Sequence, residues 1–343
     1  MKSLNPNNTT LKIKTIDLHA AGEPCRVVYD YFYDTPGETM VDKRNYLIEN
    51  QDEIRRALML EPRGHANMFG SIITRPVSPE ADAGVIFLTN SGYLDMCIHG
   101  SICTSRAVIE LGMKLKNPNK IVFDTTGGLV TAVLDYDETG KVSSVEIQNV
   151  PSFILNKEPI KLNIAEVGEI SANIVFAGNF FVVVDGDGST KINVDIADYD
   201  YLANVGMKIM KHINENYEVV HPDKPELRNV SLTVIYNRVA SNPMHVRNIV
   251  VFGKKQVDRS PCGTGTSGLM VHFNSLNELE LNTPYISESI IGSQFVGRLI
   301  DKSEISGTTY LRPAVKGIPN LMAYSEFVLD PSDCYQFGIL ALL

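Results

Sequence analysis

Two cysteines lie in surroundings that could make their thiols chemically reactive. Cys97 stands in the stretch DMCIHGS and Cys262 stands in VDRSPCGTGTSG, where small residues lead into a helical pattern. A thiol at the N-terminus of a helix lies near the positive end of the helix dipole and near free backbone N–H groups, which lower its pKa. Such a thiolate can act as a nucleophile or as a general base. The sequence therefore predicts two reactive thiols, each at a helix start.

The two stretches follow the same order of residue types. In each, a strand-rich region leads to an aspartate, Asp95 or Asp258, then to a cysteine within four residues, then to small residues and a helix. The two cysteines are about half a chain apart, which suggests two related α/β halves that each offer one thiol. Two matched acid–base groups on opposite sides of one pocket suit inversion at carbon, since one removes a proton and the other delivers one to the opposite face.

Two other chemistries fit parts of these stretches less well. The residues that follow Cys262 have the G-x-G-x-x-G spacing, but a dinucleotide fingerprint needs a strand directly before its glycines. Here the strand pattern ends at Phe252 and Pro261 lies in the intervening loop, so the glycine-rich helix start better suits a small carboxylate. A cysteine hydrolase usually has its His far away in sequence, whereas His99 is two residues from Cys97.

Composition and charge narrow the class of protein. The chain has 343 residues, of which 44% are hydrophobic and 21% are charged, and its formal net charge is -9 at pH 7. These values are typical of a soluble protein of two domains, and the negative charge argues against nucleic acid or an anionic membrane as a partner. The N-terminal stretch lacks the apolar segment of a signal peptide, and no apolar run reaches the length of a spanning helix, so we expect a cytoplasmic protein.

The remaining cysteines give no sign of a disulfide framework or a metal site. Five cysteines are an odd and sparse set for this length, and no C-x-x-C spacing occurs. Cys25, Cys103 and Cys334 are therefore interpreted as packed residues without a chemical role. We expect neither a disulfide nor a bound metal.

The periodicity of the sequence predicts the elements that position the two thiols. Amphipathic segments predict helices at 46–60, from the region of Cys97 to a C-cap at Gly112, at 196–215, and from 263 to about 279. Alternating or β-branched segments predict strands at 11–20, 25–32, 71–77, 83–90, 120–150 around the turn DETGK, 172–186, 229–237, 246–253, 288–300 and 320–330.

The two cysteine stretches resemble the two signature motifs of the proline racemase family. Further stretches are similar to family landmarks in the expected order, namely TIDLHAAGEPCRVV, EPRGHANMFG, AGNFFVVVD, RNIVVF and ESIIGSQFVGR. The likeness extends over nearly the whole chain. It implies an α/β (α+β) fold of two pseudo-symmetric domains like those of diaminopimelate epimerase. Each domain would be a curved, mostly antiparallel sheet around a central helix, with the active site in the cleft between the domains.

The resemblance also implies a domain division and a mechanism. The first domain would comprise residues 1–127 and 326–343 and carry Cys97, and the second would comprise residues 128–325 and carry Cys262. The two cysteines would be the two bases, one thiolate and one thiol at the start of each turnover. The family works without pyridoxal phosphate or metal, so we expect no cofactor, and it suggests a homodimer.

The substrate implied by the resemblance is a free imino acid, proline or a hydroxyproline. Backbone N–H groups at the two helix starts would hold its carboxylate, and Asp258 and His99 would contact its ring nitrogen. Fixed dipoles and exclusion of water would stabilise the carbanion that forms at the α-carbon. The residues implied to contact substrate are Ile98, His99, Gly100, Ser101, Asp258, Gly263, Thr264 and Phe69.

Three positions differ from the family pattern. Ile98 stands where the motif normally has Gly, and a β-branched residue restricts the backbone and narrows the carboxylate pocket. Asn67 stands where an Asp is common. Ala20-Ala21-Gly22 replace the usual Thr-Gly-Gly and make an early loop stiffer.

Two residues bear on the choice of reaction and substrate. Family members that dehydrate 3-hydroxyproline typically lack the second cysteine, because elimination needs one base, so Cys262 favours racemisation or epimerisation. Phe69 resembles the aromatic residue of the proline racemases and offers no partner to a hydroxyl, which favours proline. A 4-hydroxyproline 2-epimerase, a trans-3-hydroxyproline dehydratase and, because of Ile98, an imino-acid-binding protein without turnover remain as alternatives.

Overall fold

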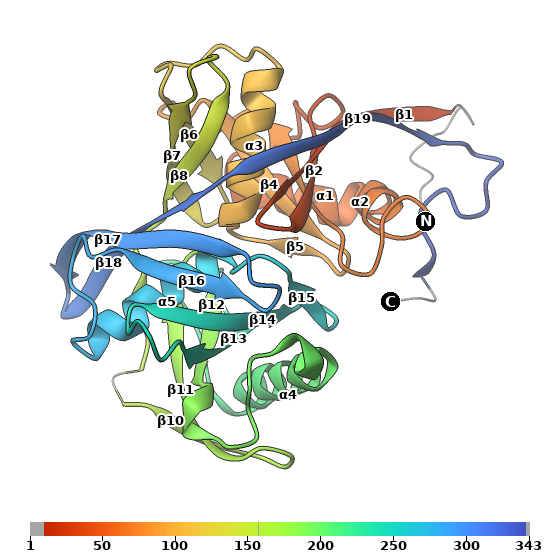
Figure 1. The fold of residues 1–343 in the computed structure, drawn as a ribbon. Coiled ribbons are helices and arrows are strands. Elements are labelled where there is room, and N and C mark those ends of the chain that lie inside the picture. Colours follow the sequence, from red (N-terminus) through yellow and green to blue (C-terminus); the bar gives the residue numbers. More distant parts are fainter. Residues whose placement is uncertain (1–9, 157, 341–343) are drawn as a thin grey trace. The chain divides into compact units, whose positions relative to one another are not determined.

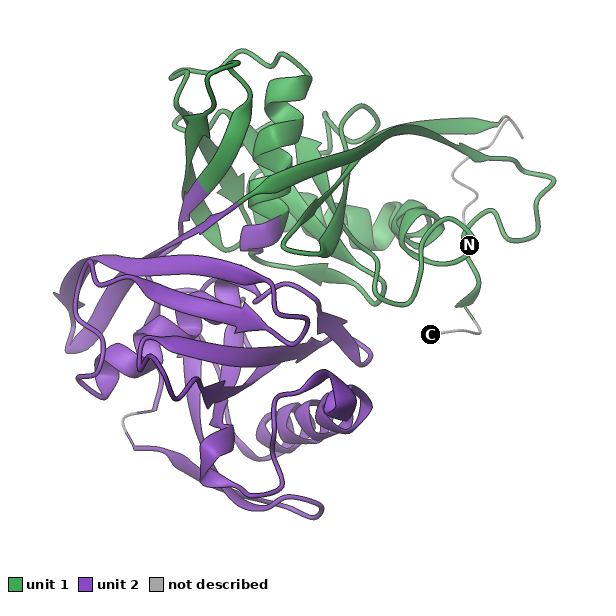
Figure 2. Cartoon of the chain, in the orientation of Figure 1, with its two compact units in different colours: residues 1–96, 100–145, 318–343 green, residues 97–99, 146–317 purple. Residues whose placement is uncertain are grey.

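The chain forms two compact units, which Figure 2 draws in different colours. The computed structural model describes residues 10–156 and 158–340. The first unit comprises the chain up to Met96, Gly100–Val145 and the chain from Ile318 onward, and the second comprises Cys97–His99 and Glu146–Gly317. The short segment that holds the first of the two cysteines is thus grouped with the unit that holds the second.

The first unit is built on strands paired in the order β19–β1–β2–β3–β4–β6–β7, with β5 also paired to β4. The pairs β2–β3 and β4–β6 are parallel and the others are antiparallel. A parallel pair needs a crossover connection, which two short helices supply in the first case and α3 in the second. The strands are β1 (Leu11–Ala20), β2 (Glu23–Val28), β3 (Phe69–Thr74), β4 (Ala83–Thr89), β5 (Tyr93–Leu94), β6 (Lys120–Thr125), β7 (Gly128–Tyr136) and β19 (Pro319–Leu329), and the helices are α1 (Met40–Asn50), α2 (Asp52–Met59) and α3 (Ile98–Glu110).

The second unit repeats this plan of a sheet with crossover helices (Figure 1). Its pairing order is β10–β11–β12–β13–β14–β16–β17–β18, with β9 also paired to β11 and β15 to β14. The strands are β9 (Phe153–Ile154), β10 (Ile160–Ile164), β11 (Gly168–Phe176), β12 (Phe180–Asp185), β13 (Val230–Arg238), β14 (His245–Phe252), β15 (Gln256–Asp258), β16 (Tyr285–Ser289), β17 (Gln294–Ile305) and β18 (Thr308–Gly317); β8 (Val142–Gln148) spans the boundary between the units. The helices are α4 (Tyr199–Asn216) and α5 (Gly263–Ser275), with short 3-10 turns at Gly186–Gly188 and Ile196–Asp198.

Helices α3 and α5 occupy equivalent places in the two topologies. In the first unit, β4 pairs with the short strand β5, then α3 begins, and the chain returns as β6 parallel to β4. In the second unit, β14 pairs with the short strand β15, then α5 begins, and the chain returns as β16 parallel to β14. The expectation of two related α/β halves, each with a thiol ahead of an equivalent helix, agrees with this topology.

Burial explains why these two helices begin with small residues. Every residue of α5 from Gly263 to Phe273 is buried, and so are the first eight residues of α3. A Cβ at Gly265 would lie only 3.1 Å from a methyl group of Val250 on β14, so the helix can pack this closely only with glycine there. Each helix is therefore surrounded by its unit rather than lying on its surface.

The unit boundaries differ from the domain division expected from the sequence. The first crossing falls after Val145 rather than after residue 127, because β7 pairs with β6 and so stays with the first unit. The second crossing falls at Ile318 rather than at residue 326, because β19 is one continuous strand paired along its length with β1.

The helices form where the sequence predicts them, with corrections at their ends. The segment 46–60 is part of two helices, because Thr39 caps α1 in a capping box and a break at Gln51 separates α1 from α2. Helix α3 ends at Glu110, close to Gly112, whose φ of 62° suits glycine. Helix α5 ends at Ser275, short of residue 279.

Membrane insertion by a helix has no support in the described part of the chain. None of the helices there is long and apolar enough to span a bilayer.

Candidate active site

Cys97 lies immediately before α3, with its sulfur against a histidine. The side chains of Cys97 and His99 are both buried, and Cys97 Sγ lies 3.1 Å from His99 Nδ1. A thiol in hydrogen-bond contact with an imidazole is the arrangement that activates cysteine nucleophiles and bases. The predicted position of Cys97 at a helix start is correct, and His99 contacts the thiol itself.

The chain just before Cys97 is held by several bonds that the sequence gave no reason to expect. The carbonyl of Asp95 accepts hydrogen bonds from the Gly127 N–H and the Thr126 hydroxyl, each at 2.9 Å. The Asp95 carboxylate forms an ion pair with Arg44 of α1. These partners come from the turn after β6 and from α1, so segments distant in sequence hold the chain where it enters α3.

Phe69 and Gly100 are brought together in the first unit. Phe69 is buried at the start of β3, and its ring lies beside that of Phe87, with 6.3 Å between the ring centroids. A Cβ at Gly100 would lie 2.9 Å from two ring carbons of Phe87 and 3.1 Å from one of Phe69. The two rings therefore press on the first turn of α3, where Ser101 is also fully buried. Phe87 is part of this arrangement and was not predicted.

Cys262 caps the N-terminus of α5. The Gly265 N–H donates to its sulfur at 3.4 Å, and the Thr264 hydroxyl lies 3.6 Å from the sulfur. The backbone of Cys262 has φ 55° and ψ 104°, a region that non-glycine residues rarely adopt and that costs about 1–3 kcal/mol. A cysteine held in this conformation has its thiol fixed over the helix start.

The pKa of Cys262 moves in the direction opposite to that expected from the helix start. Burial raises the pKa of the Cys262 thiol well above its usual value, and the nearby Asp258 charge raises it further. The Thr264 hydroxyl and the Gly265 N–H lower it, as a helix N-terminus should, but their effect is smaller. The predicted lowering is therefore wrong for Cys262, because removal of the thiol from water outweighs the helix start. Burial thus favours the protonated form of the Cys262 thiol.

Asp258 ends strand β15 and is buried. Its Oδ1 accepts a hydrogen bond from the Ser260 N–H at 2.8 Å and another from the Ser260 hydroxyl at 2.7 Å. Ser260 was missed by the sequence reasoning, although an Asp that accepts a bond from the backbone two residues later is the signature of an Asx turn. The predicted proximity of Asp258 to Cys262 agrees with the influence of its charge on the thiol.

Ile98 and Gly263, the residues that follow the two cysteines, contact each other within the second unit. A Cβ at Gly263 would overlap the Cβ and Cγ2 atoms of Ile98, whose side chain is fully buried. The side chain that departs from the family pattern thus fills the space next to the start of α5.

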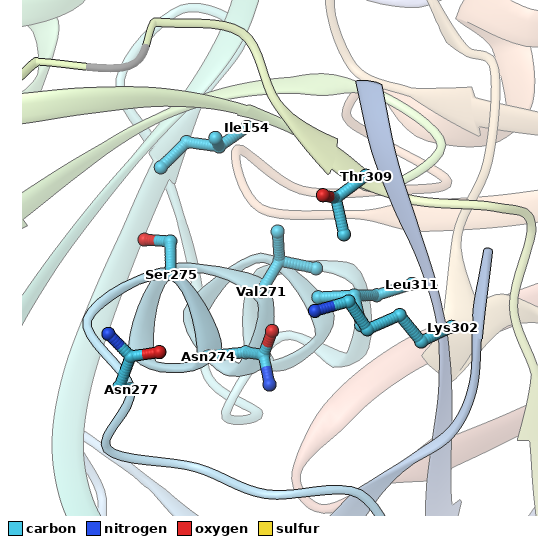
Figure 3. A pocket seen from close by; sticks show the side chains of 8 residues that line it. All are labelled: Ile154, Val271, Asn274, Ser275, Asn277, Lys302, Thr309 and Leu311. Carbon is cyan, nitrogen blue, oxygen red and sulfur yellow. The ribbon is translucent and has the colours of Figure 1, made fainter. Parts of the chain in front are cut away.

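Helix α5 also borders a pocket at its opposite end, shown in Figure 3. The pocket has a volume of about 310 Å³ and is lined by the last turns of α5 and by the β17–β18 hairpin. None of its lining residues is a site residue predicted from the sequence. In the described ranges, 10–156 and 158–340, no three His, Cys, Asp or Glu side chains cluster in a way that could hold a metal ion.

Comparison with known proteins supplies the family. The sequence model described as proline racemase matches residues 15–340. The chain is 38% identical over 329 residues to the proline racemase of Acetoanaerobium sticklandii, an alignment that covers 95% of this chain and 97% of that relative. It is 35% identical over 330 residues to the trans-3-hydroxy-L-proline dehydratase of Burkholderia ambifaria, with 96% and 98% of the two chains covered.

A solved structure agrees with this assignment. A hydroxyproline epimerase from Agrobacterium vitis, with bound trans-4-OH-L-proline, matches with a TM-score of 0.88 and 27% identity, over 96% of this chain and 95% of that one. The α/β fold and the resemblance carried by the two cysteine motifs are therefore confirmed. This chain belongs to the proline racemase family.

Proposed function

We propose that this chain is a cofactor-independent isomerase that inverts the α-carbon of free proline or a hydroxyproline, with Cys97 and Cys262 as its two acid–base groups. The observation that carries the proposal is the equivalent place of the two cysteines, each following a short strand and preceding a buried crossover helix. The contact of Ile98 with Gly263 supports it further, because it brings together the residues next to the two thiols.

The proposed reaction transfers two protons. The Cys97 thiolate, beside the His99 ring, removes the α-proton and becomes a thiol, while the electron pair stays on the α-carbon. The protonated Cys262 thiol then delivers its proton to the opposite face and becomes a thiolate. Inversion in the other direction exchanges the two roles. General acid–base catalysis of this kind contributes about 10²- to 10⁴-fold to rate.

The remaining predicted residues would bind substrate. Backbone N–H groups near Ile98-His99 and Gly263-Thr264 would hold the carboxylate, and Gly100 and Ser101 would contact the substrate beside them. Asp258 and His99 would contact the ring nitrogen, since a buried carboxylate suits a cationic ammonium. Phe69 would form an aromatic wall, which favours proline because a ring face gives a weak partner to a hydroxyl.

The second candidate is dehydration of trans-3-hydroxyproline. It is favoured by the 35% identity of this chain to the trans-3-hydroxy-L-proline dehydratase of Burkholderia ambifaria. Elimination needs only one base. The presence of Cys262 as a second acid–base group therefore favours inversion over dehydration. An imino-acid-binding protein without turnover is the remaining alternative, since Ile98 fills space beside Gly263.

Deuterium exchange tests these candidates together. Purified protein in D₂O is offered proline, trans-3-hydroxyproline or trans-4-hydroxyproline, and products are followed by NMR and chiral chromatography. The proposal expects α-deuterated inverted product from at least one substrate, without added pyridoxal phosphate and after dialysis against EDTA. Pyrroline-2-carboxylate from 3-hydroxyproline, with no inverted product, would assign the dehydratase instead. Tight binding of pyrrole-2-carboxylate without any exchange would assign the binding protein.

Serine substitutions test the two-base mechanism. Cys97→Ser and Cys262→Ser should each abolish inversion, whereas Cys25→Ser is the matched control because Cys25 is also buried and lies outside the proposed site. Circular dichroism of each variant checks that it folds. Full activity in either Cys97→Ser or Cys262→Ser rules out the two-base mechanism.

Assembly and location are proposed on the family and the sequence. We expect a homodimer, which light scattering coupled to size-exclusion chromatography measures directly, and a cytoplasmic protein, which fractionation of cells tests. A monomer that retains full activity would remove the dimer from the proposal.

A further inference from the structure

We infer that Ser260 is a positioning residue for the reaction: its hydroxyl links the Asp258 carboxylate to the backbone N–H of Cys262, so that the carboxylate and the thiol are set as one unit. This inference rests on the proposed function and deepens it, because it assigns a role to a residue that acts through Asp258 and Cys262.

The geometry of the link is complete on both sides of Ser260. The Ser260 hydroxyl donates to Asp258 Oδ1 at 2.7 Å and accepts from the Cys262 N–H at 3.1 Å. The Ser260 N–H donates to the same carboxylate oxygen at 2.8 Å. Ser260 itself is 1% exposed, so water does not compete for these bonds. One hydroxyl therefore fixes the distance between a carboxylate and the residue that carries the thiol.

Cys262 needs such a hold because of its backbone. Its φ of 55° lies in the left-handed region, which for a cysteine is maintained only when the surroundings determine it. Pro261 precedes it and has no N–H, and the Cys262 N–H donates to the Ser260 hydroxyl. Loss of the Ser260 hydroxyl leaves this N–H without its acceptor and frees the strained residue to relax.

The same hydroxyl also controls the charge next to the sulfur. Asp258 raises the pKa of Cys262 both through its charge and through a hydrogen bond. A carboxylate with one donor fewer moves more freely and spends less time beside the thiol. Removal of the hydroxyl should therefore disturb two measurable properties, the turnover of substrate and the pH at which Cys262 ionises.

The test compares Ser260→Ala and Ser260→Thr with Ser144→Ala. Ser144 is the matched control because it is buried and its hydroxyl donates to the carboxylate of Asp135 at 2.7 Å, but it lies in the first unit, outside the proposed site. Two quantities are measured, kcat and KM for the substrate found by deuterium exchange, and the pH midpoint for alkylation of Cys262 by iodoacetamide, followed by peptide mass spectrometry.

Ser260→Ala should lower kcat/KM by about 10- to 100-fold, the size of effect that loss of an outer hydrogen-bond partner has at metal sites, and should move the alkylation midpoint to lower pH. Ser260→Thr keeps the hydroxyl, so its kcat/KM and its alkylation midpoint should lie between those of Ser260→Ala and those of the starting protein. Ser144→Ala should change neither. In an Asp258→Ala background, Ser260→Ala should move the midpoint less than it does in the starting protein, because part of the effect of the hydroxyl on the thiol passes through Asp258.

The inference and the proposed function fail in different ways. If Ser260→Ala leaves the pH midpoint of alkylation unchanged and kcat/KM within twofold of that of the starting protein, the positioning role is wrong. The isomerase proposal is untouched by that result. If no substrate is turned over by the starting protein, the proposed function is wrong, but a shift of the alkylation midpoint still establishes that Ser260 sets the ionisation of Cys262. A thermal midpoint that falls equally in Ser260→Ala and Ser260→Thr, with no change in alkylation, assigns Ser260 a structural role only.

Discussion

Ile98 occupies the space that any side chain at Gly263 would need. The two residues follow Cys97 and Cys262, so the residue beside one thiol determines which residue is tolerated beside the other. In the proline racemase motif that this chain resembles, Gly stands at the position of Ile98. In this chain a large residue, Ile98, follows Cys97, and glycine follows Cys262. The two positions should therefore be considered together when relatives are compared.

This contact predicts an unusual response to Gly263→Ala. Alanine normally stabilises a helix relative to glycine by about 0.5–1 kcal/mol. Here the added methyl group overlaps a buried Ile98 side chain, so we expect a loss of about 1–3 kcal/mol in the free energy of unfolding, measured with urea, and loss of turnover.

Two variants make this prediction specific. In an Ile98→Gly background, which lacks the overlapping atoms, Gly263→Ala should cost little relative to Ile98→Gly alone. Gly268→Ala, in the same helix, is the control, because its Cβ would meet only an ordinary contact with Val175 at 3.8 Å. Equal losses in Gly263→Ala and Gly268→Ala would show that the Ile98 contact is not the cause.

The carboxylate of Asp258 should add to the effect of burial on the ionisation of Cys262. Because burial and this carboxylate raise the pKa of the thiol, alkylation at Cys262 should be slow at pH 7 and should increase only on the alkaline side of the usual cysteine range. Asp258→Asn removes the charge, so its alkylation midpoint should lie at lower pH. Asp124→Asn, at another buried carboxylate, is the control and should leave the midpoint unchanged. An unchanged midpoint in Asp258→Asn would contradict the assigned cause.

Gly100 should tolerate no side chain because two rings press on it. A methyl group there would lie 2.9 Å from Phe87 and 3.1 Å from Phe69, so Gly100→Ala should cost about 1–3 kcal/mol despite the higher helix propensity of alanine. Urea unfolding measures the cost. Adding Phe87→Leu should recover part of it by making room, and no recovery would indicate that backbone conformation rather than the ring is responsible.

The ion pair of Arg26 with Asp17 should be the main electrostatic contribution to the first unit. Arg26 is buried, donates three bonds to Asp17, and donates one each to the carbonyls of Leu58 and Arg63 at 2.7 Å. Arg26→Ala leaves a buried carboxylate unpaired, so the free energy of unfolding should fall by about 3–5 kcal/mol. Arg75→Ala breaks the exposed pair with Asp34 and should cost at most about 1 kcal/mol. Similar costs for the two variants would contradict the role of burial.

Local pattern in the sequence was sufficient for the two thiol sites. The order of aspartate, cysteine, small residues and helix is a property of a few adjacent residues, and both Cys97 and Cys262 stand at a helix start in the structure. The repeated strand–helix order also predicted two related halves. Helix ends were less certain, because a break such as Gln51 between α1 and α2 depends on a single residue within a continuous amphipathic pattern.

Tertiary structure alone decided the surroundings of the Cys262 thiol. The helix start favours a low pKa for Cys262, but only the folded chain reveals that the sulfur is removed from water and lies near Asp258, and these two effects are larger. The contact between Ile98 and Gly263 likewise joins residues far apart in the chain. Burial and long-range proximity are properties of the packed chain, whereas helix starts and motif order are properties of neighbouring residues. For this reason the sequence by itself determined that two cysteines stand at helix starts, whereas only the fold decided how deeply Cys262 is buried and which groups pack against it.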